Sequence, residues 1–187
     1  NETPVTDSRL AFLKKLIRKV RELDGSRLVT AALNTQSADG NKTIIDDPLG
    51  EFIDVIGINS YCGWYGRRPY ECRDLIWENP YDKPMIMSEV GGGALAGMRG
   101  TVDERWTEEY QAEVYECNLD MMDNIDFLAG VSPWILMDFR SPRRNLRHIQ
   151  KDYNRIGIIS ENGIRKKAFY VLQNYYENRR QNAAKTK

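Results

Sequence analysis

The chain has 187 residues, with 27 Lys and Arg against 27 Asp and Glu, so its formal net charge is zero. At about 150 residues per domain this length predicts one domain, and 41% apolar with 29% charged residues is typical of a globular protein. The balanced charge argues against a nucleic-acid partner and against an anionic membrane surface. The longest apolar runs also fall far below the roughly 18 residues that a membrane span needs.

The scarcity of His and Cys excludes several chemistries. His148 is the only His, and the three Cys at positions 62, 72 and 117 are unevenly spaced. We therefore expect no metal site, no disulfide framework and no cofactor, with the Cys side chains present as buried or inert thiols. A Ser–His–Asp triad would have to use His148, which has polar neighbours and should be exposed. Carboxylates are the remaining reagents if the protein is an enzyme.

Apolar periodicity predicts the elements of the first half. They are, in chain order, a helix over 7–23 capped by Asp7 or Ser8, a strand over 28–33, a polar loop over 34–42, a strand over 54–59, an aromatic loop over 60–66, a short helix over 73–78 and a strand over 84–88.

The same reading continues through the second half. It predicts a helix over 103–124, a strand over 130–138, a basic irregular segment over 139–153, a helix from 166 to about 180, and a disordered polar tail over 181–187. Strands alternate with helices and no hairpin signals separate the apolar strands, which favours parallel strands joined by crossover helices.

The spacing of the strand ends points to one α/β architecture. Predicted strands end at Leu33, Asn59, Glu89 and Leu136, and the first two steps are 26 and 30 residues. A (β/α)8 barrel uses about 31 residues per strand–helix unit, so this chain can hold about half of such a barrel. The chain begins at Asn1 rather than at a Met, and we expect it to be a piece of a longer protein whose localisation its first residues do not give.

Two glutamates occupy positions suited to chemistry at the carboxyl ends of barrel strands. Glu89 directly follows an apolar strand and precedes glycines that let backbone approach a ligand, while Glu2 lies three barrel steps earlier. Glycoside hydrolysis needs such a pair, because one carboxyl protonates the leaving oxygen and the other stabilises or attacks the anomeric carbon. Tyr61 or Tyr65 could keep Glu89 ionised by donating a hydrogen bond.

Several of these features have simpler structural interpretations. The aromatic cluster of Tyr61, Trp64 and Tyr65 is more often loop packing than a sugar platform, and Trp134, like the Trp106–Tyr110 pair, is most simply a core residue. The basic residues between 140 and 147 form either a solvated loop or a clamp for an acidic sugar.

The ordered set of motifs resembles the catalytic barrel of glycoside hydrolase family 2, the β-galactosidase and β-glucuronidase family. The resemblance covers almost the whole chain and implies the C-terminal half of a TIM barrel, about strands 5–8, over residues 1–180. The stretches that carry it are Asn1-Glu2 with Pro4, Asn59 to Tyr65, Ser88 to Gly91, Trp134 to Arg140, Gly157 to Ser160 and Lys166 to Gln173.

The resemblance implies roles for individual residues. Glu2 matches the general acid/base and Glu89 the nucleophile of a retaining enzyme, with β-configuration kept. The matching sugar contacts and supporting residues are Asn1 at the 2-hydroxyl, Tyr61 at the nucleophile, Asn59 and Tyr65 in the pocket, and Trp134 lining the sugar subsite.

One motif departs from the family pattern. Glucuronidases carry an Asn-x-Lys motif that grips the sugar carboxylate, and the matching positions here are Asn154, Arg155 and Ile156. Ile156 replaces the Lys, although Arg155 is adjacent, so a neutral β-galactoside or β-glucoside stays open beside a uronide.

The sequence leaves three functions open. The first is a retaining β-glycosidase with a carbohydrate substrate. The second is a non-catalytic half barrel or carbohydrate-binding remnant, whose exposed strand edges need the missing N-terminal half or another chain to cover them. The third is a different barrel enzyme that uses Glu89 as a general base.

Overall fold

The structure is a computed structural model that describes residues 1–38 and 40–185. It divides into two compact units. Unit 1 comprises residues 1–60, 74–89 and 124–132, and unit 2 comprises residues 61–73, 90–123 and 133 onward.

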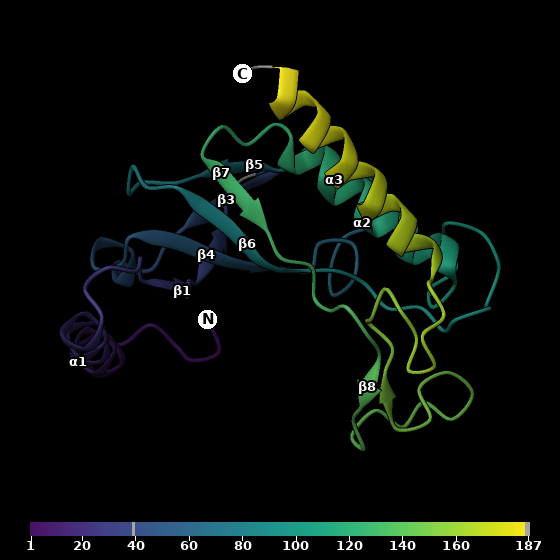
Figure 1. Ribbon diagram of the computed structural model, residues 1–187. Coiled ribbons are helices and arrows are strands. Elements are labelled where there is room, and N and C mark those ends of the chain that lie inside the picture. Colours follow the sequence, from purple (N-terminus) through teal and green to yellow (C-terminus); the bar gives the residue numbers. More distant parts are fainter. Residues whose placement is uncertain (39, 186–187) are drawn as a thin grey trace. The chain divides into compact units, whose positions relative to one another are not determined.

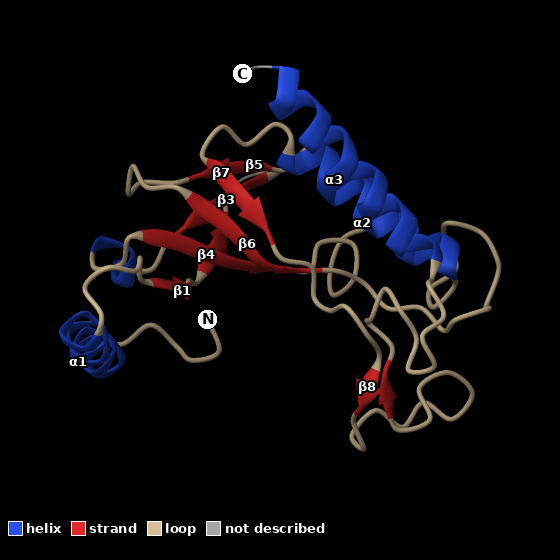
Figure 2. Ribbon diagram, in the orientation of Figure 1, coloured by secondary structure: helices blue, strands red, loops and turns tan. Residues whose placement is uncertain are grey.

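A four-stranded sheet forms the centre of unit 1 (Figure 2). Its strands lie in the order β1 (Thr30–Ala32), β4 (Val55–Ser60), β6 (Met85–Val90) and β7 (Leu128–Val131). β1 pairs in parallel with β4 and β6 pairs in parallel with β7, as the alternation of strands and helices predicts. β1 and β7 are the edge strands of this sheet, and among the described residues no further strand of the sheet pairs beyond either of them.

The sheet supplies the core of unit 1. Ile56, Ile58, Met85 and Met87 are fully buried. In β6 the buried Met85 and Met87 alternate with more exposed positions, so one face of this strand lies in the core. In β4 the intervening Gly57 is buried as well, so the middle of this strand is buried throughout.

α1 (Asp7–Leu23) has the bounds that the sequence predicts, but its cap is Thr6, whose side chain accepts from the backbone N–H of Arg9. None of its residues is buried, and Phe12 is exposed. Arg9 connects α1 to the 3-10 helix η1 (Pro48–Glu51) through two hydrogen bonds of 3.0 and 2.9 Å to the carboxylate of Asp47, which caps η1.

A second sheet corrects two sequence predictions. It comprises β2 (Thr35–Ser37), β3 (Lys42–Ile45) and β5 (Ile76–Glu78). The predicted loop over 34–42 therefore contains a strand, apart from residue 39, which lies outside the described residues. The predicted helix over 73–78 is wrong as well, because Ile76–Glu78 pairs in parallel with β3. β2 is exposed throughout, so its pairing with β3, rather than an apolar pattern, makes it a strand.

Two packed helices dominate unit 2 (Figure 1). α2 (Glu108–Met122) is capped by Thr107 and packs along α3 (Lys167–Lys185). Unit 2 also contains the 3-10 helix η2 (Pro69–Cys72) and the two-stranded pair β8 (Phe139–Arg140) and β9 (Tyr153–Asn154). α3 continues to Lys185, so residues 181–185 of the predicted disordered tail are helical; residues 186–187 lie outside the described part.

The predicted strand over 130–138 is shorter than expected. β7 ends at Val131, close before Pro133, which has no N–H to donate to a ladder. The residues that follow pair elsewhere in unit 2, because the N–H groups of Ile158 and Ile159 donate to the carbonyls of Ile135 and Leu136.

Candidate active site

Polar side chains meet at the carboxyl ends of three strands of unit 1. The Ser88 hydroxyl on β6 donates to the Oδ1 atom of Asn59 on β4 over 2.8 Å, and the Nδ2 group of Asn59 lies 3.4 Å from the Oδ1 atom of Asn1. The nitrogen of Asn1 in turn donates to the carbonyl of Ala32 at the end of β1 over 2.8 Å. These contacts connect the ends of β1, β4 and β6 and fix the orientation of the Asn59 amide.

Both candidate carboxylates are sequence neighbours of residues in this series of hydrogen bonds. Glu89 follows Ser88 on β6 and is partly buried, whereas Glu2 follows Asn1 and is exposed. The structure thus brings Asn1 and Asn59 together. Each glutamate directly follows one of the hydrogen-bonded residues in the sequence, Glu2 after Asn1 and Glu89 after Ser88. Ser88 was not singled out from the sequence, although its place directly before Glu89 at a strand end was a usable signal.

The aromatic loop after β4 belongs to unit 2, and its adjacent residues Trp64 and Tyr65 differ in burial. Trp64 is buried, with its ring centroid 4.9 Å from that of Trp106 in an edge-on arrangement and 6.2 Å from that of Tyr110. Tyr65 is 64% exposed, and its ring centroid lies 5.3 Å from that of Tyr61. Packing therefore accounts for Trp64, while Tyr65 presents a ring to solvent.

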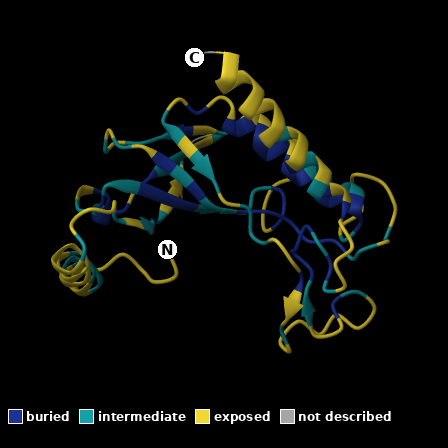
Figure 3. Ribbon diagram, viewed as in Figure 1, coloured by how far each residue is buried: buried dark blue, intermediate teal, exposed yellow. Residues whose placement is uncertain are grey.

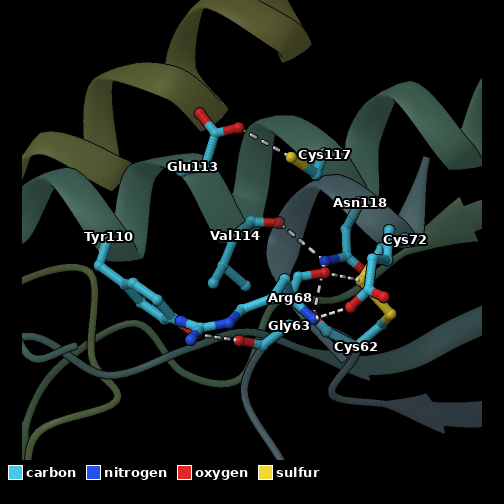
Figure 4. The surroundings of a disulfide bond; sticks show 10 residues. Cys62, Gly63, Arg68, Cys72, Tyr110, Glu113, Val114, Cys117 and Asn118 are labelled. Carbon is cyan, nitrogen blue, oxygen red and sulfur yellow. Dashed lines mark hydrogen bonds between the residues drawn. A yellow bond between two sulfur atoms is a disulfide. The ribbon is translucent and has the colours of Figure 1, made fainter. Parts of the chain in front are cut away.

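A disulfide bond closes this loop, contrary to the expectation of free thiols. Cys62 and Cys72 are joined, and only Cys117 is a free, buried thiol. Figure 4 shows the loop attached to α2: the Asn118 amide donates to the carbonyl of Cys62 over 3.0 Å and the Tyr110 hydroxyl donates to the carbonyl of Gly63 over 2.7 Å. Spacing along the chain could not predict this pair, because the segment between the two Cys folds back onto one face of α2.

The glycines after Glu89 are closely packed. A Cβ atom on Gly91 would lie 2.5 Å from the carbonyl oxygen of Trp134, and one on Gly93 would lie 2.9 Å from the ring of Trp64. All three glycines are buried. The absence of side chains lets this segment pass close against the backbone of Trp134 and the ring of Trp64.

Trp134 is partly buried and packs against the cluster of Trp64, Tyr110, Val114 and Ile156. Its N–H donates to the carbonyl of Val90 over 2.9 Å, and the Trp134–Ile135 peptide bond is cis. The core interpretation thus holds in part, because Trp134 packs against the cluster while the residue as a whole is only partly buried.

Asn154 and Arg155 differ sharply in their surroundings. Asn154 lies partly buried on β9, and its Oδ1 atom accepts from the N–H of Ile156 over 3.3 Å. The Arg155 side chain is 5% exposed and pairs with Asp138 over 3.3 Å and with Glu161. The guanidinium is therefore already neutralised within unit 2, which does not favour Arg155 as a ligand for a sugar carboxylate.

A buried ion pair that the sequence analysis did not single out supports this segment. The Lys166 ammonium donates to Asp138 over 2.8 Å, to the carbonyl of Ala94 over 2.6 Å and to that of Arg155 over 3.1 Å. Burial raises the pKa of Asp138 against the pull of Lys166, and burial likewise lowers the pKa of Lys166. The place of Asp138 at the end of an apolar run was its only sequence signal.

The described residues contain no group of three or more His, Cys, Asp or Glu side chains that could hold a metal ion. In the same residues, no helix is long and apolar enough to cross a membrane.

Comparisons with known proteins identify relatives of this barrel segment. The family model "Glycosyl hydrolases family 2, TIM barrel domain" matches residues 1–180. The human protein named beta-glucuronidase is 30% identical over 178 residues, which cover 88% of this chain and 25% of that protein. The beta-glucuronidase of Streptococcus agalactiae is 27% identical over 164 residues, covering 81% of this chain and 26% of that protein.

Solved structures agree with this assignment of the fold. A beta-glucuronidase from an uncultured Clostridium species superposes with a TM-score of 0.76 at 26% identity, covering 93% of this chain and 30% of that one. The barrel-fragment fold class predicted from the strand spacing is confirmed. The chain spans about a quarter of the length of the curated relatives it matches.

Proposed function

The chain belongs to glycosyl hydrolase family 2, and from this premise we propose that it supplies both catalytic carboxylates of a retaining β-glycosidase. The relatives that it matches are named beta-glucuronidases, so a β-glycosidase family is established while the reaction of this protein is our inference. The two carboxylates are Glu2 and Glu89.

The proposed reaction has two displacements. Glu89 attacks the anomeric carbon and forms a glycosyl ester, while Glu2 gives its proton to the departing glycosidic oxygen. Glu2 then removes a proton from water, which attacks the same carbon and releases Glu89, so two inversions preserve the β-configuration. This mechanism requires the two carboxyl groups to be about 5–5.5 Å apart when substrate is bound.

The observation that carries the proposal is the hydrogen-bonded chain from Ser88 through Asn59 to Asn1. It connects the strand ends next to both glutamates and leaves amide groups there that can hydrogen-bond a hydroxyl-rich ligand. In the proposal Asn1 contacts the sugar 2-hydroxyl and Asn59 contacts the ring, in keeping with the strand-end location of barrel active sites.

The residues of unit 2 have supporting roles in this proposal. Tyr65 and Trp134 offer ring surface to the apolar face of a sugar, since each residue is at least partly exposed. To Tyr61 we assign the role of hydrogen-bond donor to the ionised nucleophile. Arg155 acts by positioning its neighbour Asn154, because its own charge is paired with Asp138 and Glu161.

The names of the relatives make a β-D-glucuronide the first substrate to test. Ile156 is buried and apolar, so its position offers no cation to a sugar carboxylate. Turnover of chromogenic β-glucuronide, β-galacturonide, β-galactoside and β-glucoside by the full-length protein would rank the uronides against the neutral sugars.

Two substitutions test the proposed roles. Glu89→Gln removes the nucleophile and Glu2→Gln removes the acid/base, and each should reduce turnover by at least about 1,000-fold, whereas Glu51→Gln on an exposed turn should not. Proton NMR of the first product should show the β-anomer. Near-normal turnover in Glu89→Gln, or an initial α-anomer, would contradict the proposal.

A second function is favoured by one observation, the open edges of the sheet at β1 and β7. An open parallel sheet pairs readily with other strands, so this chain by itself could be an inactive carbohydrate-binding piece that needs the missing N-terminal half of the barrel. Turnover by the 187-residue chain alone, compared with the full-length protein, separates the two: activity in both supports catalysis by this chain, and activity in the longer protein alone supports the second function.

A further inference from the structure

One loop in unit 2 carries exposed basic side chains that have no role in the proposed active site. The loop between β8 and β9 and its first flank carry Arg140, Arg143, Arg144, Arg147 and Lys151, against a single acid, Asp152. All five cations are exposed, and Figure 3 shows most of the loop as exposed. This excess of positive charge stands out because the whole chain has a formal net charge of zero.

The loop carries five cations and one carboxylate, Asp152, so its charge is not balanced internally. In the described part of the chain none of them takes part in an ion pair, whereas the neighbouring Arg155 is fully committed to Asp138 and Glu161. Like charges gathered in one loop repel each other, and a bound anion removes that repulsion. The loop is therefore electrostatically suited to an anionic partner.

The backbone holds the loop in a defined shape. β8 and β9 join its base, the N–H of Ser141 donates to the carbonyl of Asp152 over 2.6 Å, and the N–H of Asp152 donates to the carbonyl of Arg144 over 2.9 Å. Gln150 is buried inside the loop, and its Oε1 atom faces the N–H of Leu146 at 3.3 Å. Such preorganisation lowers the entropy that binding would otherwise cost.

We propose that this loop, Ser141 to Asp152 with Arg140, binds the acidic groups of a carbohydrate chain, namely uronate carboxylates or sulfates beyond the sugar that is cleaved. Guanidinium groups suit this task because they form paired hydrogen bonds with carboxylate and sulfate oxygens. A glycan is favoured over a nucleic acid because the chain belongs to a carbohydrate-active family; in this respect the inference rests on the proposed function. The loop is also close in sequence to Trp134, a proposed sugar contact in the same unit.

Direct binding tests the proposal without depending on turnover. A fluorescently labelled oligogalacturonate, a heparin-derived octasaccharide and a neutral galactan octasaccharide would be titrated into the full-length protein carrying Glu89→Gln. We expect the two acidic probes to bind more tightly than the neutral probe, and raising the salt from about 50 to about 200 mM should weaken only the acidic probes. Equal binding of all three would overturn the proposal, as would tighter binding of a DNA oligomer of equal charge.

Matched variants locate the surface. The triple variant Arg143→Gln, Arg144→Gln, Arg147→Gln should lose about tenfold in affinity for the acidic probes. The corresponding Lys triple keeps the charge but not the paired hydrogen bonds, so its affinity should fall between those of the parent and the Gln triple. A control that removes three exposed cations from α1, at Lys15, Arg18 and Lys19, should bind like the parent.

Turnover of small chromogenic β-glycosides, uronides and neutral sugars alike, separates this proposal from the proposed function. The Gln triple should leave it unchanged. If turnover is absent but acidic probes bind through the loop, the catalytic proposal fails and the surface stands. If turnover is present but the Gln triple binds acidic probes like the parent, the surface fails.

Discussion

Ser88 donates its hydroxyl to the Oδ1 atom of Asn59 over 2.8 Å, and so joins the strand that carries Glu89 to its neighbour in the sheet. With Oδ1 engaged, the Nδ2 group of Asn59 must point outward as a donor, toward Asn1 in this structure. This contact therefore determines which amide atom a ligand at the strand ends would encounter.

Removal of the Ser88 hydroxyl should weaken catalysis more than folding. Ser88→Ala should lower kcat/KM by about fivefold, because one hydrogen bond of about 1 kcal/mol no longer orients Asn59. Steady-state kinetics in the full-length protein would measure this effect. Ser132→Ala, at an exposed position just after β7, is the matched control and should behave like the parent. Equal kcat/KM in both variants would remove Ser88 from the account.

The disulfide should stabilise unit 2 measurably. Closing the loop between Cys62 and Cys72, whose sequence separation is 10, removes chain entropy from the unfolded state that corresponds to about 3 kcal/mol. Reduction, or Cys72→Ser, should therefore lower the midpoint of thermal unfolding. In the unfolded protein, alkylation should detect one free thiol without reductant and three after reduction.

Cys117→Ala serves as the control for reduction. Because Cys117 lies outside the disulfide, this variant should keep its sensitivity to a reducing agent. A chain that unfolds at the same temperature with and without reductant would show that the bond contributes nothing to stability.

The attachment of α1 should depend on pH through Asp47. Burial opposes ionisation of this carboxyl, but hydrogen bonds from Arg9 and Asn34 outweigh it and lower the pKa to about 2. Because the folded pKa lies below the unfolded value of roughly 4, the contribution is present above the unfolded pKa and is lost as pH falls toward 2. We expect a loss of about 1–2 kcal/mol in the free energy of unfolding.

Asp47→Asn should flatten that part of the stability profile. Measurement of the free energy of unfolding in denaturant between about pH 5 and pH 2 would show the difference from the parent. Glu22→Gln removes an exposed partner of Lys19 and should change stability by less than about 0.5 kcal/mol. A parent and an Asp47→Asn variant with the same pH dependence would refute the role given to this pair.

The parts of the fold that the sequence predicted are those with strong local patterns. The helix over 7–23 has apolar residues at helical spacing, and the strands near 54–59 and 84–88 are short apolar runs. The structure contains all three, with small shifts at the strand ends. β2 and β5 have no such pattern, because β2 is exposed throughout and β5 has only three residues. Each is a strand because it pairs with β3.

The candidate site follows the same division. Asn59 and Glu89 could be found because strand ends are visible in the sequence, and the structure places both there. The Cys62–Cys72 bond and the Asp138–Lys166 pair could not, since each depends on segments brought together by the folded chain. Arg155 is the opposite case. Its sequence position suggested a contact to the substrate, whereas the structure buries it in ion pairs with Asp138 and Glu161.

The central claim is that Glu89 is the nucleophile of a retaining β-glycosidase, and covalent trapping tests it most directly. The full-length protein would be incubated with an activated 2-fluoro β-glycoside of the sugar that it turns over fastest, digested, and its peptides sequenced by mass spectrometry. We predict one glycosyl group per chain, on the peptide that contains Glu89 and on that carboxylate. A label on any other residue, or full turnover with no covalent intermediate at Glu89, would contradict the claim.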